Sequence, residues 1–520
     1  MPSSAGPIVA LAADPCYGAV QSRDSRFDGW FVVAVHTTHI YCRPSCPATT
    51  PKRQNMSFFP TAAAAQQRGF RACKRCRPDA SPGSPEWNIR ADAVGRAMRL
   101  IADGVVDRHG VVGLADRLGY SERHVNRLLT DELGAGPLAI ARAQRAQVAR
   151  TLIETTSITM TDVAFAAGFS SVRQFNDTVR EVFALSPTAL RALRRRRDRG
   201  AVAEHHGSST DVAGTTIALR LPVRPPFAAE QLFSFLGHRA IPGVESWDGE
   251  VFRRTLRLPQ GAGFVALRPI DGAVACTLRL DVVGDLQAAV QRCRRLLDLD
   301  ADPVAVDRSL AADGHLAHLV GRTPGLRSPG CVDGFELLVR AILGQQVSVA
   351  GARTVAGRLS AFVGDDVAHL AEPGIGVAQP TRLFPSAAAL ADIDPELLPM
   401  PATRRRALLG ACAAVAAGSL AIDPGADRSE LARQLVALPG IGPWTAQYVT
   451  MRALGDPDVF MPSDLGVRHG LDALGLDSSP RGAAALAERW SPWRSYALHH
   501  LWHSLAASPH SPQSPHRSRS

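Results

Sequence analysis

The sequence predicts a multidomain α+β protein, and three observations support this. The chain has 520 residues, enough for two to four domains. Strand-type alternation and helix-type periodicity occupy separate stretches, as is typical of segregated α+β architectures. The alternation is seen at Val274, Cys276, Leu278 and Leu280, and one helical face is marked by Phe335, Leu338, Val339, Ile342, Leu343 and Val347. Stretches rich in Ser, Gly, Pro, Thr and His at 81–85 and 201–214 indicate linkers. We expect, in order, a small cysteine-rich α/β domain at 1–80, an all-α domain at 87–200, a β-rich subdomain at 215–300, a helical domain at 301–505 and a disordered tail at 506–520.

The charge balance favours a polyanionic partner. The formal net charge is +10 and the pI is about 9.5. Lysine occurs only at Lys52 and Lys74, so nearly every basic residue is arginine. The sequence has no apolar run long enough to span a membrane and no basic-then-apolar leader. We therefore expect no membrane partner, a monomer, and a cytoplasmic, nucleoid-associated location of the bacterial type.

Four of the nine cysteines form a cluster in the first domain. Cys42-x3-Cys46 and Cys73-x2-Cys76 are two ligand pairs whose thiolates suit tetrahedral Zn²⁺. In a reducing compartment, metal ligation is expected before disulfides. The spacing alone leaves a purely structural zinc knuckle as open as an active zinc site. The apolar run that begins at Phe31 and continues to Tyr41 indicates a strand beside the cluster.

The residues around these cysteines resemble the Ada-type methyl-phosphotriester repair domain. The resemblance rests on the blocks Cys42-Arg43-Pro44-Ser45-Cys46 and Cys73-Lys74-Arg75-Cys76. It implies that zinc holds Cys42 as a thiolate, which accepts a methyl group from DNA and is not regenerated. The loss of one negative charge should then strengthen DNA binding. Residues expected to contact phosphate are Arg43, Arg71, Lys74 and Arg75.

The helical middle reads as two helix–turn–helix units. Ser121 and Ser171 suit the N-caps of the second helix in each unit. The stretch from Asp162 to Ser171 and the Ser186-Pro187 end resemble the AraC-type DNA-binding domain; an ordinary helical bundle is the alternative. Base recognition would fall to exposed residues of the second helices, namely Glu122, Arg123, Asn126, Arg127, Arg173, Gln174 and Asn176.

A short turn, Leu438-Pro439-Gly440-Ile441-Gly442, lies between two helical patterns and precedes Trp444 and Tyr448. The two glycines permit positive φ and a close backbone approach, and amide N–H groups at a helix start suit a phosphate. Asp464 follows after a proline break. A simple helix–helix connection is the alternative, and core packing is the alternative role for the aromatic side chains.

Together with the run from Glu488 to Leu498, residues 438–468 resemble the helix-hairpin-helix DNA glycosylases of the AlkA type, over roughly 215–505. The resemblance implies that Asp464 is the catalytic carboxylate. It also implies that Trp444, Tyr448 and Trp502 stack against a flipped cationic base. The DNA-binding residues that it implies are Gln345, Gln346, Leu438, Gly440 and Gly442.

Three features refine this expectation. No lysine follows Lys74, so the Schiff-base chemistry of bifunctional relatives is not expected and the glycosylase should be monofunctional. No cysteine follows Cys412, so we expect no iron–sulfur cluster. Gln346 stands where the AlkA pattern has leucine, so the efficiency of base flipping is expected to differ from that pattern. Ser463 replaces a second acidic residue, so the preference for cationic bases is expected to be weaker.

Two functions follow from the sequence. The first is a DNA alkylation repair and adaptive-response protein. It would combine a zinc-bound methyl acceptor, sequence-specific binding to double-stranded DNA, and a glycosylase that excises bases of the 3-methyladenine and 7-methylguanine type. The second is a transcription regulator whose repair modules are catalytically retired. The presence of Cys42 and Asp464 favours the first.

Overall fold

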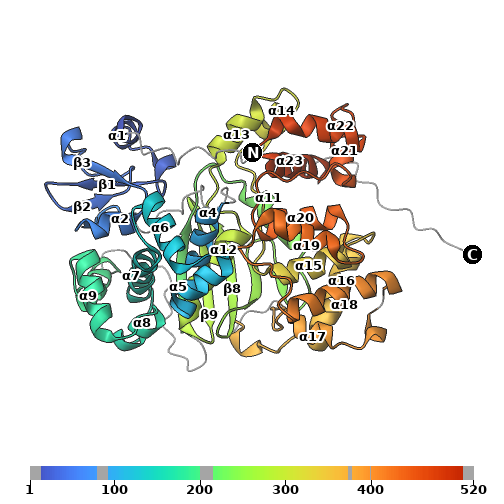
Figure 1. Ribbon diagram of the computed structural model, residues 1–520, viewed down its shortest axis with the longest axis horizontal. Coiled ribbons are helices and arrows are strands. Elements are labelled where there is room, and N and C mark those ends of the chain that lie inside the picture. Colours follow the sequence, from blue (N-terminus) through green and yellow to red (C-terminus); the bar gives the residue numbers. More distant parts are fainter. Residues whose placement is uncertain (1–12, 79–91, 199–214, 373–377, 399, 507–520) are drawn as a thin grey trace, which may run out of the picture.

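The computed structural model describes residues 13–78, 92–198, 215–372, 378–398 and 400–506 (Figure 1). It has the predicted multidomain α+β class. A small sheet domain and a helical region lie at one end, a second sheet lies in the middle, and a large helical region lies at the other end (Figure 1). Both linkers, 81–85 and 201–214, and the tail beyond residue 506 lie outside the described residues.

The N-terminal domain is a four-stranded sheet with strand order β3-β1-β2-β4. The predicted single strand from Phe31 to Tyr41 is wrong: residues 36–39 form a turn, with φ +51° at His39, so the apolar run becomes a hairpin. The elements are α1 (Ala13–Gln21), β1 (Val32–Val35), β2 (Ile40–Cys42), β3 (Met56–Phe59), α2 (Ala62–Gln67) and β4 (Arg71–Ala72), with 3₁₀ turns at Ser25–Phe27 and Arg53–Asn55.

The next region is entirely helical. Both predicted N-caps are confirmed: the hydroxyl of Ser121 accepts from the backbone N–H of His124 at 3.3 Å, and that of Ser171 accepts from Gln174 at 3.2 Å. The long helix α7 lies between the two helix–turn–helix units and packs on both. The helices are α4 (Ala93–Ala102), α5 (Val105–Leu118), α6 (Glu122–Leu133), α7 (Pro137–Thr155), α8 (Met160–Ala166), α9 (Val172–Phe183) and α10 (Pro187–Asp198).

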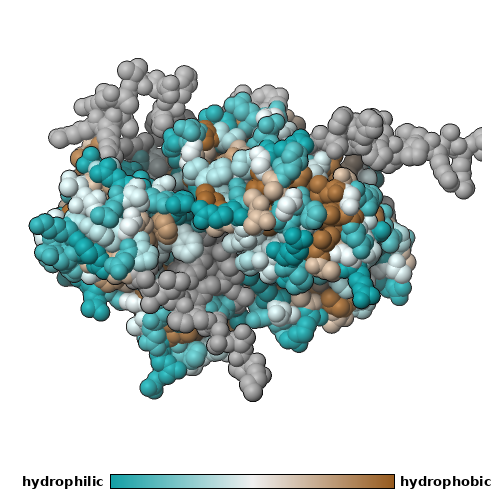
Figure 2. All heavy atoms as spheres, turned by 90° about the horizontal axis from the view of Figure 1, so that it is seen from above, coloured by the Kyte–Doolittle hydropathy of each residue, from teal (hydrophilic) through white to brown (hydrophobic). Residues whose placement is uncertain are grey.

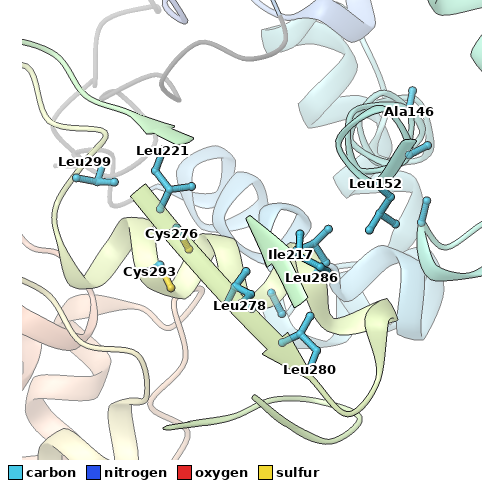
Figure 3. Packing of buried hydrophobic residues seen from close by; sticks show 14 of the residues in the cluster. Ala146, Leu152, Ile217, Leu221, Cys276, Leu278, Leu280, Leu286, Cys293 and Leu299 are labelled. Atoms are coloured by element: carbon cyan, nitrogen blue, oxygen red, sulfur yellow. The ribbon is translucent and has the colours of Figure 1, made fainter. Parts of the chain in front are cut away.

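The central sheet is antiparallel, with strand order β5-β9-β8-β7-β6. The predicted alternation in β9 is confirmed, because Val274, Cys276, Leu278 and Leu280 are all buried. Leu152 of α7 belongs to the same hydrophobic cluster as Leu278, so the helical region and the sheet share one core (Figure 3). The elements are β5 (Thr215–Pro222), α11 (Ala229–His238), β6 (Glu245–Trp247), β7 (Phe252–Arg257), β8 (Ala262–Ile270), β9 (Ala273–Leu280) and α12 (Leu286–Leu296), with a 3₁₀ turn at Val283–Asp285.

The C-terminal region is helical. Helix α15 ends at Leu343, so Val347, expected on its buried face, instead lies in the following connection with 39% of its surface exposed. A left-handed residue, Gln346 with φ +55°, follows the end of the helix. The helices are α13 (Pro303–Ala311), α14 (Ala317–Arg322), α15 (Gly334–Leu343), α16 (Val349–Val363), α17 (Ala387–Ala391), α18 (Ala402–Ala416), α19 (Arg428–Ala437), α20 (Pro443–Ala453), α21 (Leu465–Ala473), α22 (Pro480–Ala487) and α23 (Arg494–Ala506), with 3₁₀ turns at Ala368–Leu370, Pro395–Leu397 and Glu488–Trp490.

The surface seen from above is mainly hydrophilic (Figure 2). Hydrophobic residues gather to the right of centre in that view, over the end of the molecule that carries the C-terminal helices (Figures 1 and 2). Within the described part of the chain, no helix combines the length and the apolar character that a membrane crossing needs.

Candidate functional sites

The four clustered cysteines come together at one edge of the N-terminal sheet. Strands β2 and β4 are parallel neighbours, and Cys42 ends β2 while Cys73 follows β4, so both ligand-bearing loops leave the sheet on the same side. The four sulfur atoms lie within 4.8 Å of one another, and all four residues are buried. A tetrahedral zinc ion with bonds of about 2.3 Å needs sulfur atoms about 3.8 Å apart. The donor set therefore fits zinc.

The basic residues near the cluster differ in their surroundings. Lys74 and Arg75 are exposed, and Arg71 is half-buried. Arg43 points to a carboxylate: its Nη1 lies 3.4 Å from Oδ2 of the buried Asp28. Lys74 and Arg75 are thus the most available of the four predicted phosphate contacts.

The predicted recognition residues lie on the second helices of the two units. Arg123, Asn126 and Arg127 are exposed on α6 at i, i+3 and i+4, which places them on one face. On α9, Arg173 and Gln174 are exposed, and Asn176 is half-buried. These helix faces offer polar and cationic side chains to a groove.

Asp464 lies at the start of α21 and is held by three hydrogen bonds. Its Oδ1 accepts from the backbone N–H of Val467 at 2.9 Å and from Nε1 of Trp502 at 2.8 Å. Its Oδ2 accepts from Nε1 of Trp444 at 2.9 Å. The backbone N–H at the helix start and the two indole N–H groups together fix the orientation of this carboxylate. Gly466 lies against Trp502, and a Cβ there would come within 2.8 Å of the indole.

The three predicted aromatic residues converge on this carboxylate. The rings of Trp444 and Tyr448 stack with centroids 5.2 Å apart and an interplanar angle of 7°. Trp502 approaches from α23, on the other side of Asp464. We call Trp444, Tyr448, Trp502 and Asp464 the aromatic cage. Its π faces and its carboxylate suit a positively charged planar group.

Sequence reasoning missed the residues that complete this cluster. Nη1 of Arg452 donates to the hydroxyl of Tyr448 at 2.7 Å, and its guanidinium lies 5.2 Å from the ring centroid of Phe235. His499 touches Phe235 at 5.6 Å and Trp502 at 5.1 Å between centroids. Arg452, Phe235 and His499 therefore connect Tyr448 to Trp502, so that the contacts form a ring that begins and ends at Asp464. The spacing of four residues from Tyr448 could have indicated Arg452, because such residues share a helix face. Phe235 comes from α11, over two hundred residues away in sequence, and no local pattern indicates it.

Burial and charge set the ionisation around the cage. Burial alone raises the pKa of Tyr448, but Arg452 and Arg239 outweigh it and hold the pKa of this phenol below its usual value. Burial, assisted by the same two arginines, lowers the pKa of His499 well below 6.5. His499 is therefore a neutral imidazole at physiological pH. Burial also lowers the pKa of Arg239 to about 10, so this arginine stays charged at neutral pH.

The predicted DNA-binding turn adjoins the loop of Gln345 and Gln346. The amide of Gln345 donates to Gly440 O at 3.3 Å and to Thr445 Oγ1 at 3.1 Å, so this side chain joins the loop to the turn. Gln346 is exposed at the tip of the loop.

The turn itself departs from one expectation. Gly440 has φ +83°, but Gly442 has φ −90°, so the expected positive φ is wrong for Gly442. Gly442 instead caps α20, where the chain needs an extended residue. Leu438 is half-buried and Gly440 is exposed at the tip. Ser463, before the candidate catalytic carboxylate, is also exposed.

Comparison with known families matches three parts of the chain. Residues 15–79 match the metal binding domain of Ada, residues 114–193 a helix-turn-helix domain, and residues 218–333 the AlkA N-terminal domain. A Mycobacterium tuberculosis protein described as “Probable bifunctional transcriptional activator/DNA repair enzyme AlkA” is 55% identical over 490 residues, which are 94% of this chain and 96% of that protein. The chain belongs to this bifunctional AlkA family.

Two further relatives each match a part of the chain. The DNA-3-methyladenine glycosylase 2 of Escherichia coli is 33% identical over 293 residues, which are 55% of this chain and 97% of that protein. The bifunctional transcriptional activator/DNA repair enzyme Ada of Escherichia coli is 34% identical over 172 residues, 32% of this chain and 47% of that protein. The resemblances drawn from the motifs are thereby confirmed. The N-terminal domain of the chain has one structural zinc, and the four-cysteine cluster is the site that fits this ion.

Proposed function

We propose that this chain repairs alkylated DNA in two ways and regulates transcription through its helix–turn–helix region. One activity is a monofunctional glycosylase that hydrolyses the N-glycosidic bond of N-alkylated purines such as 3-methyladenine and 7-methylguanine. The observation that carries it is a single carboxylate, Asp464, held by two indole N–H groups inside an aromatic cage. The matches to the metal binding domain of Ada at 15–79 and to the AlkA N-terminal domain at 218–333 support the combination.

The cage suits the departure of a cationic base. A glycosylase first flips the damaged nucleotide out of the helix. An N-alkylated purine carries positive charge, so the faces of Trp444 and Tyr448 can hold it by cation–π contact. As the bond from C1′ to the base nitrogen breaks, both bonding electrons leave with the base. Asp464 stabilises the sugar cation that remains, and water then bonds to C1′ and loses a proton.

The flipped base leaves a gap in the base stack, and Gln346 is the residue proposed to fill it. It stands exposed at the tip of a loop that Gln345 ties to the hairpin turn. The turn at 438–442 would hold the backbone phosphates through its amide groups. Since no lysine follows Lys74, no lysine amine of the glycosylase region can form a Schiff base, and the strand should stay unbroken.

The second activity is a stoichiometric methyl transfer in the N-terminal domain. Zinc keeps its cysteine ligands ionised at neutral pH. The sulfur of Cys42 forms a bond to the methyl carbon, the bond from carbon to the phosphotriester oxygen breaks, and that electron pair stays on the phosphate. No proton moves. The thioether carries one negative charge fewer than the thiolate, so repulsion from DNA falls and affinity rises.

The proposed partner is double-stranded DNA, both alkylated DNA and promoter DNA. The exposed faces of α6 and α9 would read the promoter. We further propose that the chain works as a monomer in the cytoplasm, on the nucleoid. A transcription regulator with retired repair modules is the second candidate, and the intact cysteine cluster and the oriented Asp464 disfavour it.

The test is base release from duplex DNA treated with dimethyl sulfate. The full chain is expected to liberate free 3-methyladenine and 7-methylguanine, to leave abasic sites in unbroken strands, and to form no adduct on borohydride reduction. Mass spectrometry should place one methyl group on Cys42. Failure to release any base and to take up any methyl would leave the regulator as the function.

A further inference from the structure

The loop that carries Cys42 and Cys46 is held by one buried carboxylate. Oδ1 of Asp28 accepts from the backbone N–H of Ser45 at 3.0 Å, and Oδ2 accepts from the Ser45 hydroxyl at 2.6 Å. The same Oδ2 pairs with Arg43 at 3.4 Å. Asp28 is only 3% exposed. Between the two cysteines, Arg43 and Ser45 are the residues with polar side chains, and the Asp28 carboxylate holds both of them.

Asp28 is in turn held from the glycosylase half of the chain. Nη2 of Arg224, just beyond β5, donates to the backbone carbonyl of Asp28 at 2.6 Å. Nη1 of the same guanidinium donates to the carbonyl of Asp300 at 2.8 Å. Arg224 is 3% exposed, and its own carbonyl accepts from Nη2 of Arg327 at 2.7 Å. The planar, buried guanidinium of Arg224 therefore joins the segments of Asp28 and Asp300, which lie far apart in sequence.

Breaking the two hydrogen bonds of the Arg224 guanidinium would cost free energy. A buried backbone carbonyl that loses its donor is left unsatisfied, and hydrogen bonds from a charged donor are the stronger kind. The guanidinium cannot shift toward one carbonyl without losing the other. The position of Asp28, and with it the cysteine loop, is therefore fixed relative to the central sheet.

We infer that Arg224 and Asp28 are positioning residues for methyl transfer, so that the glycosylase half orients the methyl acceptor of the N-terminal domain. This rests on the proposed function of Cys42. Methyl transfer needs the sulfur in line with the breaking bond, at about 3–3.5 Å from the carbon, and a misplacement of about 1 Å can cost roughly a hundredfold in rate. A loop tethered at Ser45 sets that alignment.

The test uses the full chain with Arg224→Met, which keeps the aliphatic bulk and removes every donor. The matched control is Arg220→Met, because Arg220 is an exposed arginine of β5 that donates to the carbonyl of Asp271. The probe is a duplex oligonucleotide with one radiolabelled methyl phosphotriester. The rate of label transfer, the zinc content, and the release of free bases from methylated DNA are measured for each protein.

Arg224→Met is expected to slow methyl transfer by about tenfold or more, with one zinc retained and base release within about twofold of wild type. Arg220→Met should match wild type in all three. Hydrogen exchange of the segment 42–46 should be faster in Arg224→Met alone, because the Ser45 amide loses its fixed acceptor. Arg224→Lys has an ammonium donor but cannot reach both carbonyls with one planar group, so its rate of methyl transfer should lie between those of wild type and Arg224→Met.

Two results would overturn the inference. One is methyl transfer at the wild-type rate with unchanged exchange of segment 42–46. The other is an equal loss of methyl transfer and base release, which would show a general loss of stability. If Arg224→Met does not fold, the same comparison is made between Arg224→Lys and wild type. If wild type itself takes up no methyl, the proposed acceptor function fails, while the exchange of segment 42–46 still decides whether Arg224 positions the loop.

Discussion

Asp464 both begins helix α21 and receives the N–H groups of two tryptophans. The first role is local, because an aspartate before a helical pattern is a common N-cap and can be found in a sequence window. The second role depends on tertiary packing. Trp444 comes from α20 and Trp502 from α23, and only the fold brings them to one carboxylate.

The histidines of α23 give a pH prediction at the residue scale. His500 is 2% exposed, and burial, with a smaller effect of His503, lowers its pKa to about 4. In the unfolded chain its pKa should be about 6.5, so between these values the unfolded state binds a proton that the folded state does not. The stabilisation is therefore complete above about pH 6.5 and is lost as the pH falls toward 4.

For wild type, this group alone should lower the free energy of unfolding by about 2 kcal/mol between about pH 7.5 and pH 5. His500→Leu removes the group. Urea unfolding of both proteins at several pH values measures the difference, and the other titrating groups cancel between them. Parallel stability curves for the two proteins would contradict the assignment.

Sequence reasoning located the residues of the site that carry a local signal and missed those that do not. The cysteine pairs, Trp444 and Tyr448 stand at fixed short spacings. Phe235 and Arg239 lie on and just after α11, where their pattern reads as an ordinary helix. Their distance from α23 in sequence hides the contact of Phe235 with His499. Asp28 gives no signal at all, because a lone aspartate in a loop has many possible partners.

At the scale of elements, the turn between α19 and α20 shows how one glycine can be essential and its neighbour replaceable. Gly440 has φ +83°, and a Cβ there would lie 2.6 Å from the Cβ of Ala407. Gly442 has φ −90°, and a Cβ there would meet nothing within 4 Å. The left-handed conformation alone costs a non-glycine residue about 1–2 kcal/mol.

We therefore expect Gly440→Ala to lower the free energy of unfolding by at least about 1 kcal/mol and Gly442→Ala to change it by less than about 0.5 kcal/mol. Chemical denaturation of the two variants is the measurement, and each serves as the control for the other. Equal destabilisation by both changes would show that the turn is not set by the conformation of Gly440.

The elements that the sequence predicted well are those whose ends have local chemistry. Ser121 and Ser171 cap their helices as expected because a hydroxyl next to a helical pattern has a free N–H within reach. The hairpin turn at 36–39 was missed because the β-branched Thr37 and Thr38 continue the strand-type pattern, and neither Gly nor Pro marks the turn. Val347 was misplaced because helical periodicity does not show where a helix ends.

At the scale of the whole molecule, the regulatory and repair parts are packed against each other. Helix α4 of the middle region lies against the C-terminal region: Nε of Arg96 donates to Gly425 O and Nε of Arg99 to Pro424 O, both at 2.6 Å. Asp103, at the end of α4, pairs with Arg295 of α12 at 3.3 Å. These contacts join three parts of the chain, so their unfolding should be coupled.

Gly425 tests that coupling. A Cβ at this position would lie 2.4 Å from Cγ of Leu100, which is buried in α4. Gly425→Ala must displace the Leu100 side chain from its packed position and should weaken the interface by about 1–3 kcal/mol. Calorimetry should then show that the middle region unfolds at a lower temperature than the rest of the chain, as a separate transition. Gly410→Ala, in α18 with nothing within 4 Å, is the control, and identical profiles for the two variants would contradict the coupling.

We propose that one chain carries two repair sites with separate chemistry, one at Cys42 and one at Asp464. The most direct measurement is a single reaction of the Asp464→Asn variant with methylated duplex DNA, in which free 3-methyladenine and the methyl content of Cys42 are both quantified. The amide that replaces the carboxylate in this variant would keep its shape but lack the charge that stabilises the sugar cation, so base release should fall by at least about a hundredfold. Methyl uptake should equal that of wild type. Unchanged base release would contradict the role of Asp464, and the loss of both activities together would contradict two separate repair sites.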